Sequence, residues 1–198
     1  MGKVFVEITM SLDGFIAGPG VSNEQPMGVN GERLHEWIFG KATEADKQWM
    51  DELVKTSGAV ITGNHTYRIA IDGPWGGVTP FSAPAFVVCH VVPSKTVKGF
   101  EYITGGIHEA LDRATAVAKE KNIWIMGGAA VIQQYIKAGL VDELRLHIAP
   151  ILLMQGTRLF DNTGTSLVEL IKEKVSQTPG ALHTVFRFKT SEKSPGRV

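Results

Sequence analysis

The sequence predicts an α/β domain in which helices cover a mostly parallel sheet that ends in an antiparallel hairpin. Short apolar runs, typical of strands buried on both faces, alternate with segments whose apolar residues recur at helical spacing. Near the end, two strand-like segments, 167–176 and 183–190, are joined through Pro179-Gly180, which is typical of a hairpin. No internal repeat or interdomain linker divides the chain.

Composition and charge argue against nucleic-acid-binding, membrane-spanning and cysteine-ligated zinc proteins. The 198 residues are 43% apolar, which suits one compact domain with a substantial core. Lys plus Arg and Asp plus Glu each number 20, so the net charge is zero and no basic stripe predicts a nucleic-acid partner. No apolar stretch has the length of a membrane span, and the alternating N-terminus differs from a signal peptide. Cys89 is the only cysteine, which excludes a cysteine-based zinc site, so we expect a cytoplasmic protein without a metal.

The first elements follow from local pattern. Residues 4–10 alternate as a strand, and the polar segment 11–18 turns away from the sheet. The Gly- and Pro-rich segment 18–31 is long for a compact domain, so we interpret it as a lid beside the first strand. Residues 32–39 predict a short helix, with Leu34, Trp37 and Ile38 on one side.

The middle of the chain continues the alternation. Thr43 is a suitable N-cap for a helix that ends at Ser57-Gly58. A buried strand over 59–62 turns at Gly63 into a short helix near 67–71, and the Gly- and Pro-rich segment 72–84 predicts a surface loop. Strands over 85–92 and 102–104 and a helix over 107–121 complete this part.

Residues 122–160 contain the most informative pattern. A strand over 123–126 is followed at once by Gly127 and Gly128, then by a helix over 129–138 and a strand over 144–153. The first turn of a helix has unpaired N–H groups, and glycines before it let a pyrophosphate approach closely. A plain tight turn between strand and helix fits this local pattern equally well.

The predicted topology brings several turns to one edge. Ligands of open α/β sheets bind beyond the carboxyl ends of the strands. The turns after Met10, Thr62, Cys89 and Met126 are therefore expected to share that edge.

These turns carry a resemblance to a known superfamily. The run VITGNHTYRIA resembles the first cofactor element of dihydrofolate reductases, and IWIMGGAAVIQQYIKAGLVDELRLHIAPILLMQGTRLF resembles their second. The opening SLDGFIAG is more similar to the reductase domain of the bifunctional deaminase-reductase of riboflavin biosynthesis. The resemblance covers residue 4 to about residue 188. It implies a stand-alone, three-layer dihydrofolate reductase-like domain over 1–190, followed by a flexible tail over 191–198.

The resemblance implies an NADPH-dependent reductase that transfers hydride to a small heterocyclic or ribosyl-type substrate. It places Asp13 against the substrate's ribityl or ribosyl part, and Ala17 and Gly18 close to the nicotinamide. It further implies a homodimer, with the terminal hairpin and residues 149–154 as candidate contact surfaces. The residues implied to bind the cofactor are Ala17, Gly18, Gly63, Asn64, His65, Thr66, His90, Gly127, Gly128, Ala129 and Ala130.

The sequence departs from the superfamily in three respects. Asn64 stands where a basic residue often holds the 2′-phosphate, so His65, Arg68 and His90 are expected to supply that charge. The zinc deaminase partner domain is missing, since it needs several zinc ligands including cysteines. No counterpart of the pterin-binding carboxylate is evident, because the candidates lie on helices whose acidic residues suit a solvated surface. These candidates are Glu32, Glu36, Asp46 and Asp51.

Other interpretations of the same residues stay open. Asp13 fits a turn residue, and His65 fits a helix cap. The alternative functions are a non-catalytic NADP-binding module, suggested by the missing carboxylate, and a true dihydrofolate reductase.

Overall fold

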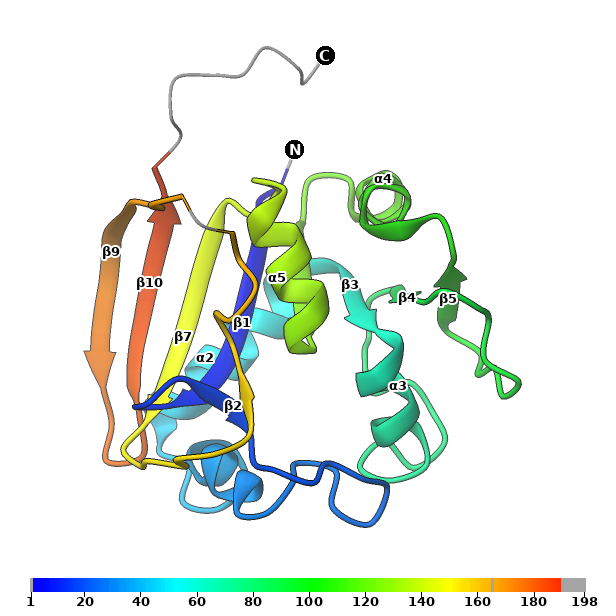
Figure 1. Cartoon of the computed structure of the whole chain (residues 1–198). Coiled ribbons are helices and arrows are strands. Elements are labelled where there is room, and N and C mark those ends of the chain that lie inside the picture. The colour runs from blue at the N-terminus through cyan, green and yellow to red at the C-terminus, as the bar shows by residue number, and fades with distance from the viewer. Residues whose placement is uncertain (1, 165, 190–198) are drawn as a thin grey trace.

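The computed structural model describes residues 2–164 and 166–189, and it shows one large sheet between two layers of helices (Figure 1). The strands are β1 (Val4–Ser11), β2 (Phe15–Ala17), β3 (Ser57–Gly63), β4 (Ala85–Val88), β5 (Phe100–Ile103), β6 (Asn122–Gly127), β7 (Glu143–Ala149), β8 (Thr157–Arg158), β9 (Leu170–Gln177) and β10 (Leu182–Phe188). The helices are the 3-10 segment η1 (Gly31–His35), α1 (Glu36–Phe39), α2 (Glu44–Thr56), α3 (Asn64–Ile71), α4 (Gly106–Ala118) and α5 (Ala129–Lys137).

The sheet has the order β5-β4-β3-β6-β1-β7-β10-β9. Neighbours from β5 to β7 are parallel, and β10 then pairs antiparallel with both β7 and β9. This arrangement confirms the predicted α/β class with its antiparallel C-terminal hairpin.

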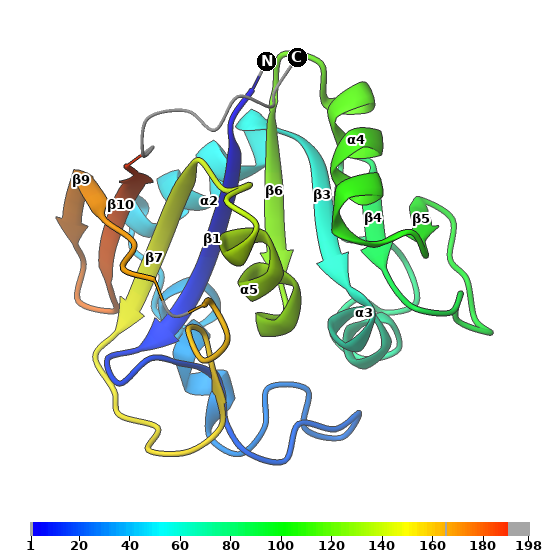
Figure 2. The same cartoon turned by 45° about the horizontal axis from the view of Figure 1, so that its top comes forward.

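Two helical layers bury opposite faces of the sheet (Figure 2). On one face, Val6 of β1 and Ile125 of β6 share a core with Ala114 of α4 and with Ile132 and Tyr135 of α5. On the other face, Trp37, Trp49 and Val185 form a second cluster beneath α1 and α2. A third cluster, which includes Tyr67 of α3 and Val87 of β4, packs α3 against the sheet.

Helix α2 begins where the sequence predicts. The Thr43 hydroxyl accepts a hydrogen bond from the Asp46 amide, and the Asp46 carboxylate accepts one from the Thr43 amide, so the two residues form a capping box. The buried stripe of this helix runs through Asp46, Trp49 and Leu53. The expectation that Asp46 belongs to a solvated surface is therefore wrong, since the residue is only 1% exposed. Its pairing with Thr43 and with His183 satisfies the buried carboxylate.

Several boundaries differ from the sequence prediction. Strand β7 ends at Ala149, because Pro150 has no amide hydrogen for the ladder. Strand β4 ends at Val88, and Val91 is 76% exposed. The expected turn over 11–18 contains strand β2, which pairs with the unpredicted β8 to form a second, two-stranded sheet.

Within residues 2–164 and 166–189, no helix is long and apolar enough to cross a membrane. The tail over 191–198 lies outside the described residues.

Candidate functional site

A cavity of about 1120 Å³ lies at the carboxyl edge of the sheet, beyond β3, β4 and β6. The beginnings of α3 and α5 and the segment after β4 line it. All four turns expected to share this edge do so, because β1, β3, β4 and β6 run parallel. The turns after Thr62, Cys89 and Met126 line the cavity, whereas the turn after Met10, where β1 leads into β2, lies outside its lining.

Two helix starts converge on the cavity. Neither α3, after Gly63, nor α5, after Gly128, has a side-chain hydrogen bond capping its first turn. A Cβ at Gly63 would lie 2.9 Å from a methyl group of Val131, and one at Gly128 would lie 2.7 Å from the Thr66 hydroxyl. Glycine at both positions therefore allows the helix starts to approach each other, and their first N–H groups form an anion-binding edge.

Two buried polar atoms at this edge have no hydrogen-bond partner within the described chain. They are the hydroxyl of Thr62, at the end of β3, and the side-chain oxygen of Asn64, at the start of α3. Buried polar groups are normally paired, so such atoms need an explanation. Asn64 lines the cavity, so a ligand there that carries an O–H or N–H group could donate to its side-chain oxygen, whereas Thr62 is outside the lining.

Basic side chains surround the same cavity. His65, Arg68 and His90 are all among its lining residues. Lys95 also lines it and forms an ion pair with Asp72. Arg68 is a permanent cation, and the imidazoles of His65 and His90 add ring N–H donors, so these side chains favour an anionic ligand.

Most of the predicted cofactor residues meet in this cavity. Its lining includes Gly63, Asn64, His65, Thr66, His90, Gly128, Ala129 and Ala130. Gly127 immediately precedes this group as the last residue of β6. Ala17 and Gly18 are outside the lining, but Ala17 pairs with Thr157, which belongs to it.

The predicted substrate residue, Asp13, occupies the turn between β1 and β2. Its carboxylate accepts hydrogen bonds from the Ser11 hydroxyl at 2.5 Å and from the amides of Leu153 and Met154 at 3.1 and 2.8 Å. Burial disfavours the charge, but these hydrogen bonds outweigh it and lower the pKa of Asp13. The carboxylate therefore fastens the turn to the segment after β7, and its contact with a substrate remains a prediction.

The sequence interpretation predicted the helix after Gly106 but missed that its start lines the cavity. Thr104 and Gly106 line the cavity where α4 begins, and α4 also has no side-chain cap at its N-cap residue, Gly105. The signal was present as a strand followed by a glycine pair and a helix, the same order as at Gly127-Gly128. Asn23, Ser94 and Gln134 also line the cavity, and no local pattern marks them as ligand-binding.

A model of the RibD C-terminal domain matches residues 2–184, almost the whole chain. The chain belongs to the RibD C-terminal domain family. Membership indicates an oxidoreductase of the reductase type.

Two sequence relatives match this chain, one over most of its length and one over a short segment. Over 162 residues the chain is 28% identical to the uncharacterized protein YwjB of Bacillus subtilis (strain 168), covering 80% of this chain and 82% of that protein. A match of 52% identity to YyaP of the same organism spans 40 residues, which is 20% of this chain and 21% of YyaP.

Solved structures share the fold. A putative riboflavin biosynthesis protein from Shewanella sp. PV-4 has a TM-score of 0.74 at 20% identity, covering 95% of this chain and 99% of its own. A pyrimidine reductase-like protein from Corynebacterium diphtheriae has a TM-score of 0.63 at 15% identity, covering 96% and 93%. RibD from Acinetobacter baumannii has a TM-score of 0.65 at 18% identity, and this chain spans 59% of it. These likenesses confirm the three-layer, dihydrofolate reductase-like fold.

Proposed function

We propose that this protein is an NADPH-dependent reductase that transfers hydride to a small heterocyclic or ribosyl-type acceptor. The observation that carries the proposal is the convergence of the uncapped starts of α3 and α5 on a cavity lined by His65, Arg68 and His90. Helix starts, the Arg68 guanidinium and the ring N–H donors of the two histidines together favour a dinucleotide with several phosphates. Membership in a reductase-type family supports the same chemistry.

The proposal assigns parts of NADPH to particular residues. The first turn of α5, at Ala129 and Ala130, suits the pyrophosphate, because Gly128 allows close approach. His65, Arg68 and His90 would hold the 2′-phosphate in place of the basic residue that Asn64 replaces. Bound NADPH would supply the hydride, and the chain would bind and orient it.

The acceptor is proposed from the same relatives. One structural relative is described as pyrimidine reductase-like and another as a riboflavin biosynthesis protein. A ribosylamino-pyrimidine such as 5-amino-6-(5-phosphoribosylamino)uracil is therefore the acceptor to test first, followed by reducible pterins.

A matched pair of variants at Ala130 tests the phosphate site. Ala130 is exposed in the first turn of α5 and lines the cavity, so both Asp and Asn fit there. Ala130→Asp adds a negative charge that suits the helix start but repels a phosphate. We expect NADPH affinity to fall at least about tenfold, or about 1.4 kcal/mol, in Ala130→Asp and much less in Ala130→Asn. Fluorescence titration measures both, and equal affinities would remove the phosphate assignment.

Gly128→Asp tests the same phosphate site, but its result is harder to interpret. Its side chain would enter the phosphate position, but its Cβ would also lie 2.7 Å from the Thr66 hydroxyl. A loss of affinity there mixes charge repulsion with displaced packing.

Turnover separates a reductase from a non-catalytic NADP-binding module. The wild-type protein is titrated with NADPH and NADH and then assayed for NADPH oxidation with each acceptor. We expect tighter binding of NADPH and oxidation with one acceptor. Binding without oxidation by any ribosylamino-pyrimidine or pterin would favour the module instead.

A further inference from the structure

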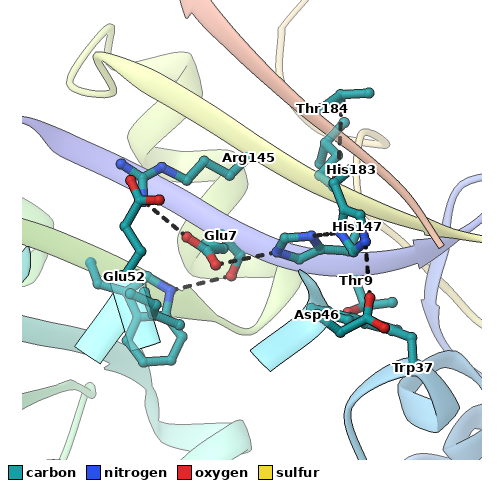
Figure 3. A network of polar contacts seen from close by, with 12 residues as sticks. Glu7, Thr9, Trp37, Asp46, Glu52, Arg145, His147, His183 and Thr184 are labelled. Atoms are coloured by element: carbon teal, nitrogen blue, oxygen red, sulfur yellow. Dashed lines mark hydrogen bonds and ion pairs between the residues drawn. The ribbon is translucent and has the colours of Figure 1, made fainter. Parts of the chain in front are cut away.

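A buried polar network lies on the α2 side of the sheet, and the proposed reductase function does not use it (Figure 3). Glu7 of β1, Arg145 and His147 of β7, His183 of β10 and Asp46 of α2 contribute its side chains. All five residues are at most 6% exposed. Burying this many ionisable groups is costly unless their charges and hydrogen bonds are matched.

Two histidines form the centre of the network. The Nδ1 atoms of His147 and His183 are 2.8 Å apart. The Nε2 atom of His147 is 3.2 Å from a carboxylate oxygen of Glu7, and Nε2 of His183 is 3.1 Å from one of Asp46. A row of carboxylate, imidazole, imidazole and carboxylate therefore joins β1 to α2.

The surrounding contacts identify both carboxylates as acceptors. Asp46 accepts from the Thr43 amide at 2.8 Å and the Thr43 hydroxyl at 2.6 Å. The Thr178 hydroxyl has one hydrogen and lies 2.8 Å from Asp46 but 3.3 Å from Nε2 of His183, so it donates to Asp46. Burial disfavours the charge on Asp46, but the hydrogen bonds from Thr43 and Thr178 and nearby His183 lower the pKa of this carboxyl. Glu7 accepts from Arg145 at 3.2 Å.

Counting hydrogens then determines the charge of the pair. Each Nε2 atom faces an ionised carboxylate and must carry a hydrogen, because two lone pairs at 3.1–3.2 Å would repel. The Nδ1 contact needs one further hydrogen between its two atoms. The four ring nitrogens therefore carry three hydrogens, whereas two neutral imidazoles carry only two.

The charges of the neighbouring groups agree with this count. Glu7, Glu143 and Asp46 supply three negative charges, while Arg145 and Lys3, which pair with Glu7 and Glu143, supply two positive ones. One proton on the histidine pair makes the sum zero.

Other ionisable groups face the network from the elements packed against it. His35 of η1 is near His147, and its pKa is about 4, lowered by burial and by His147, so it is neutral. Lys174 of β9 lies outside, 4.0 Å above the Trp49 ring. Exposed Glu52 of α2 is at the Arg145 end (Figure 3). None of these replaces the missing positive charge beside Asp46.

Two indole rings enclose the pair and favour a cation. The Trp37 ring is 4.4 Å from the His147 ring and 5.0 Å from that of His183. The Trp49 ring is 5.5 Å from His147 and stacks at 5.4 Å on His183. Only the Trp49–His183 contact is stacked face to face, and at this distance, within about 6 Å, an aromatic face stabilises a cation.

We infer that His147 and His183 hold one proton between them, and that this shared proton fastens helix α2 to the sheet. A second proton is excluded, because it would place two N–H groups against each other at 2.8 Å. Burial and then the neighbouring His147 lower the pKa of His183 more than Asp46 and Glu7 raise it, which is the direction expected if a second proton is excluded. Loss of the shared proton would leave the Asp46 charge facing a ring nitrogen without a hydrogen.

The pair makes stability depend on pH in both directions. In the unfolded chain both histidines titrate near about pH 6.5. Below that value the unfolded chain binds two protons at these residues and the folded pair binds one, so stability falls as pH falls. Above it the folded pair retains a proton that the unfolded chain has lost, so stability also falls as pH rises towards the pKa of the shared proton.

Nitrogen-resolved NMR of the histidine rings in the wild-type protein tests the inference. His65, His90 and His108 are exposed, and their ring signals are recorded in the same spectra for comparison. At about pH 8 we expect three hydrogens on the four ring nitrogens of His147 and His183. Two hydrogens, meaning two neutral rings at about pH 8, would overturn the inference, as would four at about pH 6.

A matched pair of variants tests whether the Asp46 carboxylate retains the third hydrogen on the histidine pair. In Asp46→Asn the amide can donate to Nε2 of His183, so we expect the pair to lose its third hydrogen at about pH 8. Thr178→Val removes a hydroxyl bound to Asp46 but leaves both carboxylates, so the third hydrogen should remain. Retention in Asp46→Asn, or loss in Thr178→Val, would contradict the role of the carboxylate. If Asp46→Asn does not fold, the wild-type spectrum alone decides.

Discussion

At the scale of single residues, Asp13 combines an observed role with a predicted one. One of its carboxylate oxygens accepts from Ser11 and Leu153, and the other accepts from Met154. An ionised carboxylate offers about four acceptor positions, so a position remains for a substrate hydroxyl. The residue can therefore fasten the turn and still contact a ribityl or ribosyl group.

Asp13→Asn tests the two roles separately. The amide nitrogen of Asn cannot accept a backbone N–H, so we expect a stability loss of about 1–3 kcal/mol in urea denaturation at neutral pH. Because hydrogen bonds lower the pKa of Asp13, its contribution is present above the ordinary Asp value of about 4 and is lost as pH falls through the folded value. The difference in unfolding free energy between the wild type and Asp13→Asn should therefore narrow as the pH falls. The control variant Asp161→Asn, at an exposed position, should show no such difference from the wild type. For the substrate role, kcat/KM should fall about tenfold or more while NADPH affinity is kept.

At the scale of elements, the start of α2 links a helix cap to the buried network. Thr43→Ala removes the hydroxyl that accepts from the Asp46 amide and donates to the Asp46 carboxylate. We expect a loss of about 1–2 kcal/mol in the free energy of unfolding, the usual cost of a lost cap. Thr43→Ser keeps the hydroxyl and should stay close to wild type in the same denaturation series. Equal losses in the two variants would show that the methyl group, not the cap, matters.

Elements with a strong local signal could be predicted from the sequence. The N-cap at Thr43 and the helix after Gly128 follow from propensity and spacing alone. Strands β2 and β8 could not be predicted, because their short pairing joins Phe15 and Arg158 across the chain and has no periodicity of its own. Burial of Asp46 was missed for a related reason, since its partner His183 is distant in sequence and comes from another strand.

At the scale of the whole molecule, predicting the site required both topology and resemblance. The turns that form the cavity could be expected to meet because parallel strands share a carboxyl edge. The bonds from Asp13 to Leu153 and Met154 could not, because they depend on how the segment after β7 folds back. The assignment of these turns to a dinucleotide came from the resemblance, which the family match supports.

The whole molecule, over its described residues, also leaves one face of the β9–β10 hairpin without a covering helix. Figures 1 and 2 show α5 over the middle of the sheet and no helix, in the described chain, over the hairpin on that side. Val175 pairs with Thr184, which pairs with core residue Leu146, so Val175 points to the α5 side. Val175 and Leu182, on the same side, are 51% and 37% exposed. Such an apolar patch beside an edge strand suits an interface.

We therefore propose that this hairpin face, one of the two candidate contact surfaces of the predicted homodimer, joins two copies of the chain. Light scattering at micromolar concentration should give twice the chain mass of 21.5 kDa. Val175→Lys places a charge in the patch, so it should shift the mass towards that of one chain. Val117→Lys is the control, because Val117 is 43% exposed on α4, away from the hairpin. A wild-type mass of one chain would refute the homodimer, and a dimer unchanged by Val175→Lys would place the interface elsewhere, with residues 149–154 as the next surface to mutate.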